Sequence, residues 1–396
     1  MKKTILISIA LSTLLLHATE NENLEKRVES LEKALKANQE KLLEEKMQKA
    51  ISGSDSFNQQ AFVPNIAFIA NMSAVSRNIN NNEYSNYSID GFIKNAGEIP
   101  FNKKRGFNLN YGEMEISSTV DPYFDIDTAL HIEKEGLHIG ELYVTTKALP
   151  YGLRLKAGKF KSEFGRINSK HQHNWRFSNI PLVLESYFGA GGLGDEGIQL
   201  TYTLPTDTYL MAGYEAMQGS NGRSFGEDDA NSLNIGYLKS GLDITDSTSL
   251  LLGATLMRGD NPNGKTDIYG GDLTLKTIFD SYSSLTWQSE LLYRNKDLVN
   301  NTEAKQAGAY SELIYGHDSN WATGVRYDTL FKNIKNQPDD LNKYTAMVEY
   351  KPFEFSKIRL QYVYDKSKSF GGKRKNGQEI LLDLTIESGS HGAHAF

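Results

Sequence analysis

Residues Ile198-Gln-Leu-Thr-Tyr-Thr-Leu204 alternate large apolar side chains with polar ones at every step. Successive side chains of a β-strand point to opposite faces, so this alternation predicts a strand with one apolar and one polar face. The same period recurs at residues 285–294, 321–328 and 358–365. Periodicity alone leaves two architectures open, because a soluble sandwich turns its apolar face inward and a membrane barrel turns it toward lipid.

The lengths of the connections favour the membrane barrel. Tight turns alternate along the chain with longer loops. The tight turns lie at 121–122, 149–152, 205–206, 245–246, 280–281, 317–320 and 351–355, and the longer loops lie at 77–106, 164–193, 218–231, 259–266, 295–304, 332–342 and 367–377. Only the connection at 134–136 is short on the long-loop side. Short turns on one rim and long loops on the other are typical of outer-membrane barrels. The sequence therefore predicts an all-β fold, an antiparallel up-and-down transmembrane β-barrel of sixteen strands, at 65–76, 107–119, 122–133, 137–147, 151–163, 194–204, 207–217, 232–243, 247–258, 267–278, 282–294, 305–316, 320–331, 343–351, 355–366 and 378–387.

The composition agrees with this fold and excludes other classes. The 396 residues include 21 Tyr and 18 Phe, which are common in strands, and no Cys, so disulfides and cysteine-ligated metals are impossible. No apolar run after residue 20 approaches the ~18 to 20 residues of a spanning helix. The net charge of −6 gives no footprint for nucleic acid.

The N-terminal 62 residues differ from the rest. Residues 1–18 have the charged start, short apolar core and small final residue of a cleaved signal peptide; an uncleaved anchor is the alternative. Residues 21–50 carry apolar residues at heptad spacing and predict a coiled-coil helix, which either self-associates into a homo-oligomer or acts as an unpaired amphipathic spacer. Residues 51–62 form a polar linker, followed by the barrel at 63–396.

The two ends of the barrel segment are expected on the same side of the membrane. An even number of strands returns the chain to its starting rim, so the N-terminal helix and the C-terminus are both predicted in the periplasm, with the barrel in the lipid of the outer membrane. The terminal aromatic residue, Phe396, is typical of such barrels, although the alternation fades after Ile386.

The predicted inward face carries charged residues. An acidic stripe lies on three successive strands and consists of Glu113, Glu115, Asp125, Asp127, His131 and Glu141. The next strand carries two basic residues, Arg154 and Lys156, and later strands carry Arg326, Asp328 and Arg359. A pore with acidic and basic walls would sort solutes by charge. Alternatively, these groups pair with one another without any effect on selectivity. Linker 51–62 is too short for a plug domain, so loops 77–106 and 164–193 are the candidates for narrowing the lumen.

Loop 164–193 contains two histidines, His171 and His173, which an extended backbone would place on one side. Such a pair can share Zn²⁺, but a third ligand is needed, and Glu163, Glu185, Asp195 or another loop would have to supply it. The alternative is that the histidines only form hydrogen bonds within a packed loop. The sequence therefore predicts no cofactor, and zinc at this pair is the alternative.

Several segments resemble a family of proteobacterial outer-membrane proteins described as porin-like or zinc-regulated TonB-dependent-receptor-like. The similar segments are 112–116, 121–124, 153–164, 171–175, 194–200 and 392–396, and the resemblance is densest over 107–205. It implies an outer-membrane channel or receptor, with His171 and His173 at the family's histidine-loop positions. The chain departs from energy-coupled receptors, since it shows no plug or coupling box and its predicted strands fall short of the ~22 that such receptors use.

These observations predict a channel for small hydrophilic or charged solutes rather than an enzyme. The alternative is a receptor or channel for metal ions or metal complexes. Catalysis is not expected, because the one run with histidine, aspartate and serine together, 317–320, falls in a predicted turn. By analogy with general porins, a homo-oligomer assembled through residues 21–50 would be a trimer.

Overall fold

The structure of the protein, a computed structural model, describes residues 63–94, 99–133, 136–226, 232–331 and 341–389. The predicted signal peptide, coiled-coil helix and linker, and Phe396, lie outside these ranges. Among the described residues, no helix is both long enough and apolar enough to cross a membrane.

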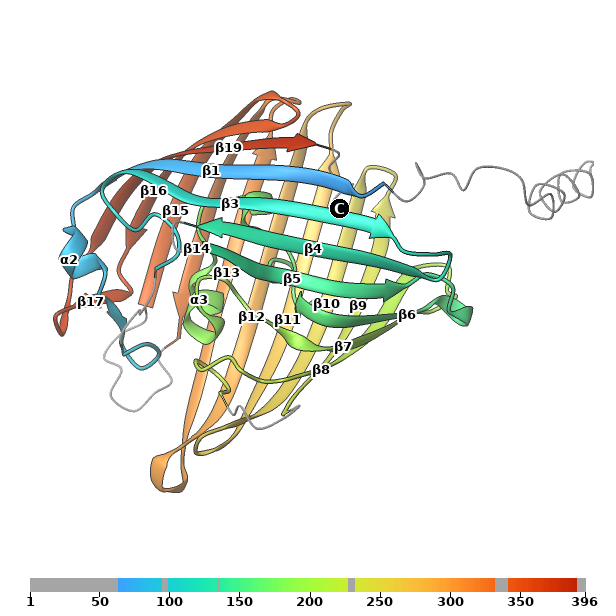
Figure 1. The fold of residues 1–396 in the computed structure, drawn as a ribbon. Helices are drawn as coiled ribbons and strands as arrows, with labels where there is room; N and C mark the ends of the chain where they lie inside the picture. The colour runs from blue at the N-terminus through green and yellow to red at the C-terminus, as the bar shows by residue number, and fades with distance from the viewer. Residues whose placement is uncertain (1–62, 95–98, 134–135, 227–231, 332–340, 390–396) are drawn as a thin grey trace, which may run out of the picture. The chain divides into compact units, whose positions relative to one another are not determined.

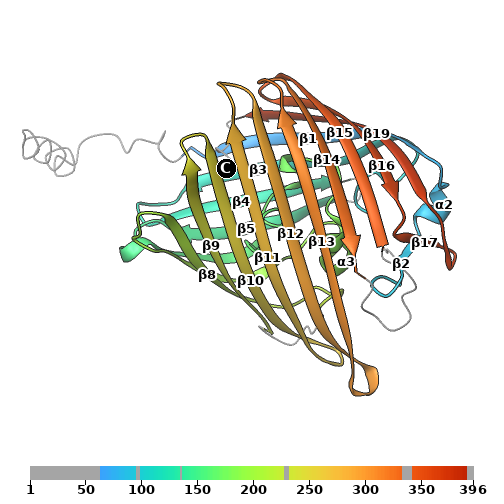
Figure 2. The same cartoon turned by 180° about the vertical axis from the view of Figure 1, so that it is seen from behind.

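Within the described ranges, sixteen antiparallel strands close into a barrel, and β1 pairs with β19 to complete the ring (Figures 1 and 2). The barrel strands are β1 (Asn65–Arg77), β3 (Gly106–Thr119), β4 (Phe124–Glu133), β5 (Gly136–Thr146), β6 (Leu153–Lys161), β7 (Gly194–Thr203), β8 (Tyr209–Met217), β9 (Leu233–Thr245), β10 (Thr248–Asn261), β11 (Gly264–Ile278), β12 (Ser284–Leu298), β13 (Thr302–Gly316), β14 (Trp321–Leu330), β15 (Leu341–Phe353), β16 (Ser356–Asp365) and β19 (Gly377–Gly389).

Shorter elements lie between these strands. A small sheet joins β2 (Ser88–Ile89), β17 (Lys368–Phe370) and β18 (Lys373–Arg374), which come from loops far apart in the chain. The helical pieces of the described residues are α2 (Asn81–Tyr84), α3 (Leu182–Phe188) and the 3₁₀ turns at Pro150–Gly152, Gln172–Asn174 and Val299–Asn301. Neither α-helix exceeds seven residues.

The predicted barrel and its sixteen strands are confirmed, with differences of a few residues at the strand ends. Two predicted long loops, 259–266 and 295–304, are wrong: β10 and β11 meet in a hairpin between Asn261 and Gly264, and β12 and β13 continue to within three residues of each other. The sequence there is polar, which is typical of loops. Strand pairing uses backbone hydrogen bonds, however, so a hairpin of polar residues can continue beyond the part of the barrel whose outer face is apolar.

The two faces of the barrel wall divide as the alternation predicted. On β7, Ile198 and Leu200 are exposed on the outside whereas Gln199 and Thr201 are buried, and on β16 Leu360 is 52% exposed whereas Gln361 is fully buried. A soluble protein would not leave such a continuous apolar outer surface in water. The apolar face is therefore the outer one, as in a transmembrane barrel, and the sandwich alternative is excluded.

Exposed aromatic residues gather toward both edges of this outer face. Near the short-turn rim, which joins β3–β4, β5–β6, β7–β8, β9–β10, β11–β12, β13–β14 and β15–β16, they are Tyr123, Phe124, Tyr151, Tyr209, Phe279, Tyr282, Trp321, Phe353 and Phe355. Nearer the opposite, long-loop rim they include Phe107, Tyr214, Tyr269, Tyr327, Tyr344 and Tyr362. Aromatic side chains prefer the membrane–water interface, so the two groups mark the two surfaces of the bilayer.

A charge placed on the outer face tests this orientation. Val325 is 55% exposed near the middle of β14. Val325→Arg should destabilise the barrel folded in lipid vesicles by about 2–4 kcal/mol, because an arginine would lie in hydrocarbon. Val325→Ala is the matched control and should cost much less in the same denaturant titration. Equal stabilities of the two variants would contradict a lipid contact at this position.

Candidate functional site

Residues 162–193, which we call the inner segment, leave the wall after β6 and return at β7. The segment contacts strands on every side of the barrel. Ser162 donates a hydrogen bond to Glu215 on β8 (2.5 Å), the Leu182 amide donates to Asp328 on β14 (2.8 Å), and His171 contacts β3 and β5. A segment that touches the inward faces of opposite walls must lie inside the barrel, and both views show its helix α3 among the strands (Figures 1 and 2). The predicted loop 164–193 therefore fills part of the lumen.

Asn168 closes the base of the inner segment. Its side-chain amide donates to the carbonyl oxygens of Ser162 (2.7 Å) and Leu193 (2.8 Å), and its Oδ1 accepts from the Leu193 amide (2.7 Å). Gly165 makes the turn into the lumen at φ +61°, where an added Cβ would also meet the Glu290 carboxylate. The entrance and exit of the segment are thus joined by one buried side chain.

An apolar core holds the inner segment against the wall. All seven residues of α3 are buried, together with Phe164 and Trp175. The apolar residues among them belong to a cluster that includes inward-facing Met257, Ile268, Leu292 and Leu330 of the wall strands. The inward face is therefore not polar throughout. These apolar residues on the polar side of their strands are the sequence signal for a segment packed in the lumen, and the prediction of a polar inward face did not include them.

Arg326, Asp328 and Arg359 point into the barrel, where they hold the inner segment. Arg326 donates from Nη1 to the Asn179 carbonyl (2.9 Å) and from Nε to Asp328 Oδ2 (3.0 Å). Arg359 donates from Nη2 to the Trp175 carbonyl (2.9 Å) and to Glu349 on β15 (2.5 Å). Each of the three predicted residues is at most 3% exposed, so all are covered by the segment rather than by water.

Nearer the short-turn rim, inward charges remain in contact with water. Asp125 pairs with Lys147 (2.9 Å), and each side chain is 37% exposed. Arg154 is exposed, Asp127 is half-buried, and Lys156 pairs with Glu163 (2.9 Å). Acidic groups on β4 and basic groups on β6 thus lie near this rim, and most of these charged residues have an opposite charge close by.

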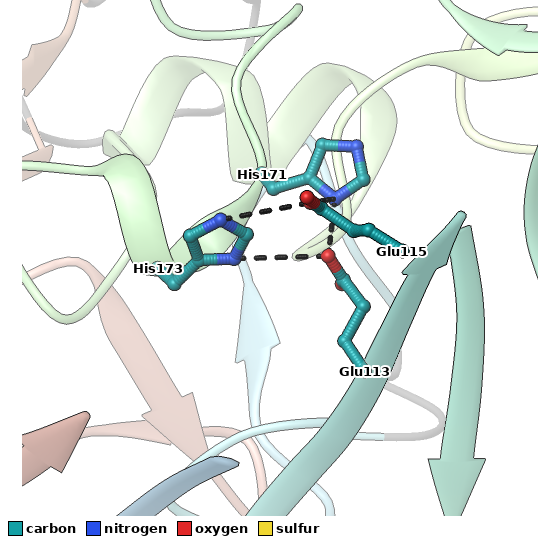
Figure 3. A group of neighbouring side chains, drawn as sticks. All are labelled: Glu113, Glu115, His171 and His173. Carbon is teal, nitrogen blue, oxygen red and sulfur yellow. Dashed lines mark hydrogen bonds and ion pairs between the residues drawn. The ribbon is translucent and has the colours of Figure 1, made fainter. Parts of the chain in front are cut away.

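The two glutamates of β3, Glu113 and Glu115, meet the two histidines of the inner segment (Figure 3). Glu141 of β5 joins them. His171 lies between two carboxylates, with Nδ1 2.8 Å from Glu113 and Nε2 2.5 Å from Glu141. His173 Nδ1 is 3.7 Å from Glu113, and its Nε2 is 3.8 Å from Glu115. His131 of β4 approaches the other oxygen of Glu113 at 3.2 Å. Residues that belong to separate groups in the sequence therefore form one cluster.

The cluster favours positive charge at its centre. Burial lowers the pKa of His171, but the hydrogen bonds and charges of Glu113 and Glu141 outweigh burial and raise it to about 10. His171 is therefore an imidazolium at neutral pH whenever nothing else neutralises these carboxylates. A cation of another kind could take the place of its proton.

The other acidic residues considered as metal ligands lie elsewhere. Glu163 pairs with Lys156, and Asp195 accepts from the amides of Gly219 and Ser220 (both 2.8 Å). Glu185 is bonded by Tyr87 and lies near Lys343 and Lys368 (3.8 and 3.6 Å). Burial raises the pKa of Glu185, but the positive charges of Lys368 and Lys343 have the larger effect and lower this pKa to about 2. The carboxylates beside the histidines come from the barrel wall instead.

Run 317–320 forms the turn between β13 and β14 at the short-turn rim. His317 is hydrogen-bonded to Thr323 (3.0 Å), and Ser319 donates to Asn320 (2.9 Å). The histidine and the serine thus have different partners, and they are not arranged as nucleophile and base.

The solved structures that resemble this barrel are bacterial porins and channels. They include an anion-selective porin from Comamonas acidovorans (9% identity, TM-score 0.56, 82% of this chain and 99% of that one), the channel DcaP of Acinetobacter baumannii (11%, 0.55, 82% and 97%) and OprB of Pseudomonas putida (9%, 0.55, 86% and 97%). At these identities the likeness defines the fold. The protein is an outer-membrane type of β-barrel with the porin architecture.

Sequence comparison places the chain in a family. An uncharacterised protein of Aquifex aeolicus (strain VF5) is 36% identical over 383 residues, covering 86% of this chain and 81% of its own length. The chain belongs to the same family as that protein. No family model matches the sequence.

Removing the clamp at the base should loosen the inner segment. Asn168→Ala deletes three hydrogen bonds in a buried place, at about 1 kcal/mol each. We expect the segment to open about 100-fold more often, measured by amide hydrogen exchange of residues 162–193, with β10–β13 unchanged. Asn376→Ala, which removes an exposed side chain bonded to Tyr364, is the control. Unchanged exchange in Asn168→Ala would show that the clamp is dispensable.

Proposed function

We propose that the protein is an outer-membrane channel through which small hydrophilic or charged solutes diffuse. The observation that carries this proposal is the closed barrel of sixteen strands with water-exposed charges on its inner wall, at Asp125, Lys147 and Arg154. A barrel of this size is wider than its own side chains can fill, so it encloses space for an aqueous path. The lipid-facing outer surface places that path across a membrane.

The inner segment is the constriction of this channel. It reduces the open cross-section, and hydrogen bonds from Arg326 of β14 and Arg359 of β16 are among the contacts that hold it in the lumen. Solutes would pass through the part of the lumen near the short-turn rim that the segment leaves in contact with water, where β4 contributes Asp125 and Asp127 and β6 contributes Arg154. Charges of both signs across a narrow path create a transverse field that favours hydrated ions and polar solutes.

Planar-bilayer recording tests the channel directly. The purified protein should insert in discrete steps of conductance, and a KCl gradient should give a reversal potential different from zero, since the lining charges are not symmetric. A folded protein that inserts without conductance would overturn the proposal.

Freeing the inner segment should widen the path. Arg359→Ala removes the donors to Trp175 and Glu349, so the segment should leave the β15–β16 wall more often. We expect larger single-channel conductance, by about twofold or more, or frequent transitions to a larger level. Arg258→Ala removes an arginine that is 65% exposed and should leave conductance unchanged. Identical traces for both variants would rule out the segment as the constriction.

The predicted N-terminal elements complete the proposal. Residues 1–18 direct export, residues 21–50 form a periplasmic coiled coil that assembles a homo-oligomer, a trimer by the porin analogy, and the C-terminus is also periplasmic. Cross-linking the intact chain should give a ladder ending at the oligomer, and deleting residues 21–50 should abolish it. Oligomers that survive the deletion would exclude the helix as the assembling element.

A second candidate is passage of metal ions or metal complexes, as the zinc-regulated receptor-like resemblance implies. The specific observation in its favour is the group of two histidines and two glutamates facing the lumen. Vesicles containing the protein and a zinc-sensitive dye should then take up Zn²⁺ faster than Mg²⁺. Equal uptake of the two ions would leave the general channel as the function.

A further inference from the structure

Two kinds of metal-ligating side chain lie close together in the barrel: the carboxylates of Glu113 and Glu115 and the imidazoles of His171 and His173. The glutamates belong to β3 of the wall and the histidines to the inner segment, so the cluster lies where the segment meets the wall (Figure 3). We propose that these four side chains bind one divalent transition-metal ion of the zinc class and that the ion fastens the inner segment to the wall. This resident site is independent of what the channel conducts.

The spacing of the donors fits a single ion. One ligand atom from each residue lies within 4.8 Å of all the others. His171 Nδ1 is 2.8 Å from Glu113 and 3.9 Å from Glu115, and His173 Nδ1 is 3.7 Å from Glu113. Ligands around a tetrahedral zinc, at about 2.0–2.2 Å from the metal, are about 3.3 Å from one another. Side-chain movements below about 1 Å would therefore complete the coordination.

The surroundings supply the support that metal ligands use in proteins. A metal-bound histidine commonly donates its second ring N–H to a carboxylate, which fixes the ring and increases its basicity. His171 has this arrangement, because Nδ1 faces the cluster while Nε2 lies 2.5 Å from Glu141. The second oxygen of Glu113 likewise has a neighbour, His131 Nε2, at 3.2 Å. These two contacts come from β5 and β4, so they are independent of the four ligands.

Burial makes the site closed on one side and open on the other. The side chains of His173 and Glu113 are 0% and 4% exposed, whereas those of His171 and Glu115 are 16% and 26% exposed. Two carboxylates held close together away from water are unfavourable unless a positive group lies between them. A dication that enters past Glu115 and His171 would provide that charge.

The donor types select the metal. Two imidazoles and two carboxylates suit Zn²⁺ and neighbouring transition metals, whereas Mg²⁺ and Ca²⁺ prefer oxygen donors alone. Zinc is accordingly the probe, and Co²⁺ serves as its spectroscopic substitute. The site should ignore Mg²⁺ at concentrations that saturate it with Zn²⁺.

Calorimetry on the purified protein, treated with EDTA and exchanged into metal-free buffer, tests the site. ZnCl₂ should bind with one strong equivalent per chain and MgCl₂ should not bind. Glu115→Gln, which keeps the shape of a partly exposed side chain, and His173→Ala should each weaken binding at least tenfold. The double substitution of His391 and His394 by Ala removes two other histidines and should leave the strong equivalent intact.

Two further measurements separate loss of the site from loss of the fold. Co²⁺ should give visible absorption bands of tetrahedral coordination in the parent and in the His391/His394 double variant, but not in Glu115→Gln. Zn²⁺ should raise the thermal midpoint of the parent and protect residues 162–193 from protease, with no such protection in Glu115→Gln. A folded parent without a stoichiometric zinc equivalent, or a Glu115→Gln variant that binds like the parent, would overturn the proposal. A silent bilayer recording beside normal zinc binding would overturn only the channel.

Discussion

The closed hydrogen-bonded ladder from β1 round to β19 is the constraint on which the rest of the structure depends. In hydrocarbon there is no water to satisfy a free backbone N–H or C=O group, so a sheet must pair every edge, and here β1 and β19 pair over eleven residues from Ala67 to Arg77. Closure fixes the alternation of faces, because each strand then has one side toward lipid and one toward the interior. The apolar outer surface and its aromatic edges follow from that division.

Closure of this many strands also creates a problem inside. The wall side chains alone do not span the interior, and charged groups on the inner face need partners or water. The inner segment fills part of the interior and provides partners for some of the charged groups. Its helix α3 fills the space beside Leu292 and Leu330, and its backbone carbonyls at Trp175 and Asn179 receive the guanidinium groups of the wall. Where the segment does not reach, as at Asp125 and Lys147, the wall charges pair with one another in contact with water.

The fold was predictable from the sequence because a barrel strand is specified locally. Two faces in contact with different solvents impose a period of two, and sixteen strands could be located from that period and from turn lengths. The exceptions have a physical cause: between Arg258 and Thr266 polar residues occupy both faces of the hairpin, including the buried Asn261 and Thr266, so the alternation disappears although the ladder continues. The connection between β4 and β5 was recognised as short from the same spacing.

The candidate site was predictable only in part, because it depends on contacts between residues distant in sequence. The acidic residues of β3 and β5 and the two histidines were each found by residue type, but 58 residues separate Glu113 from His171, and nothing local indicates that the loop turns inward. The information that was present lay in exceptions to the pattern. Ile268 and Leu292 are apolar on a polar face, which requires something apolar to cover them, and the inner segment supplies an apolar run, Pro181 to Leu184, to the same cluster. An inward-facing apolar residue near the rim of a wide barrel is thus a marker, carried by the sequence itself, of what packs in the lumen.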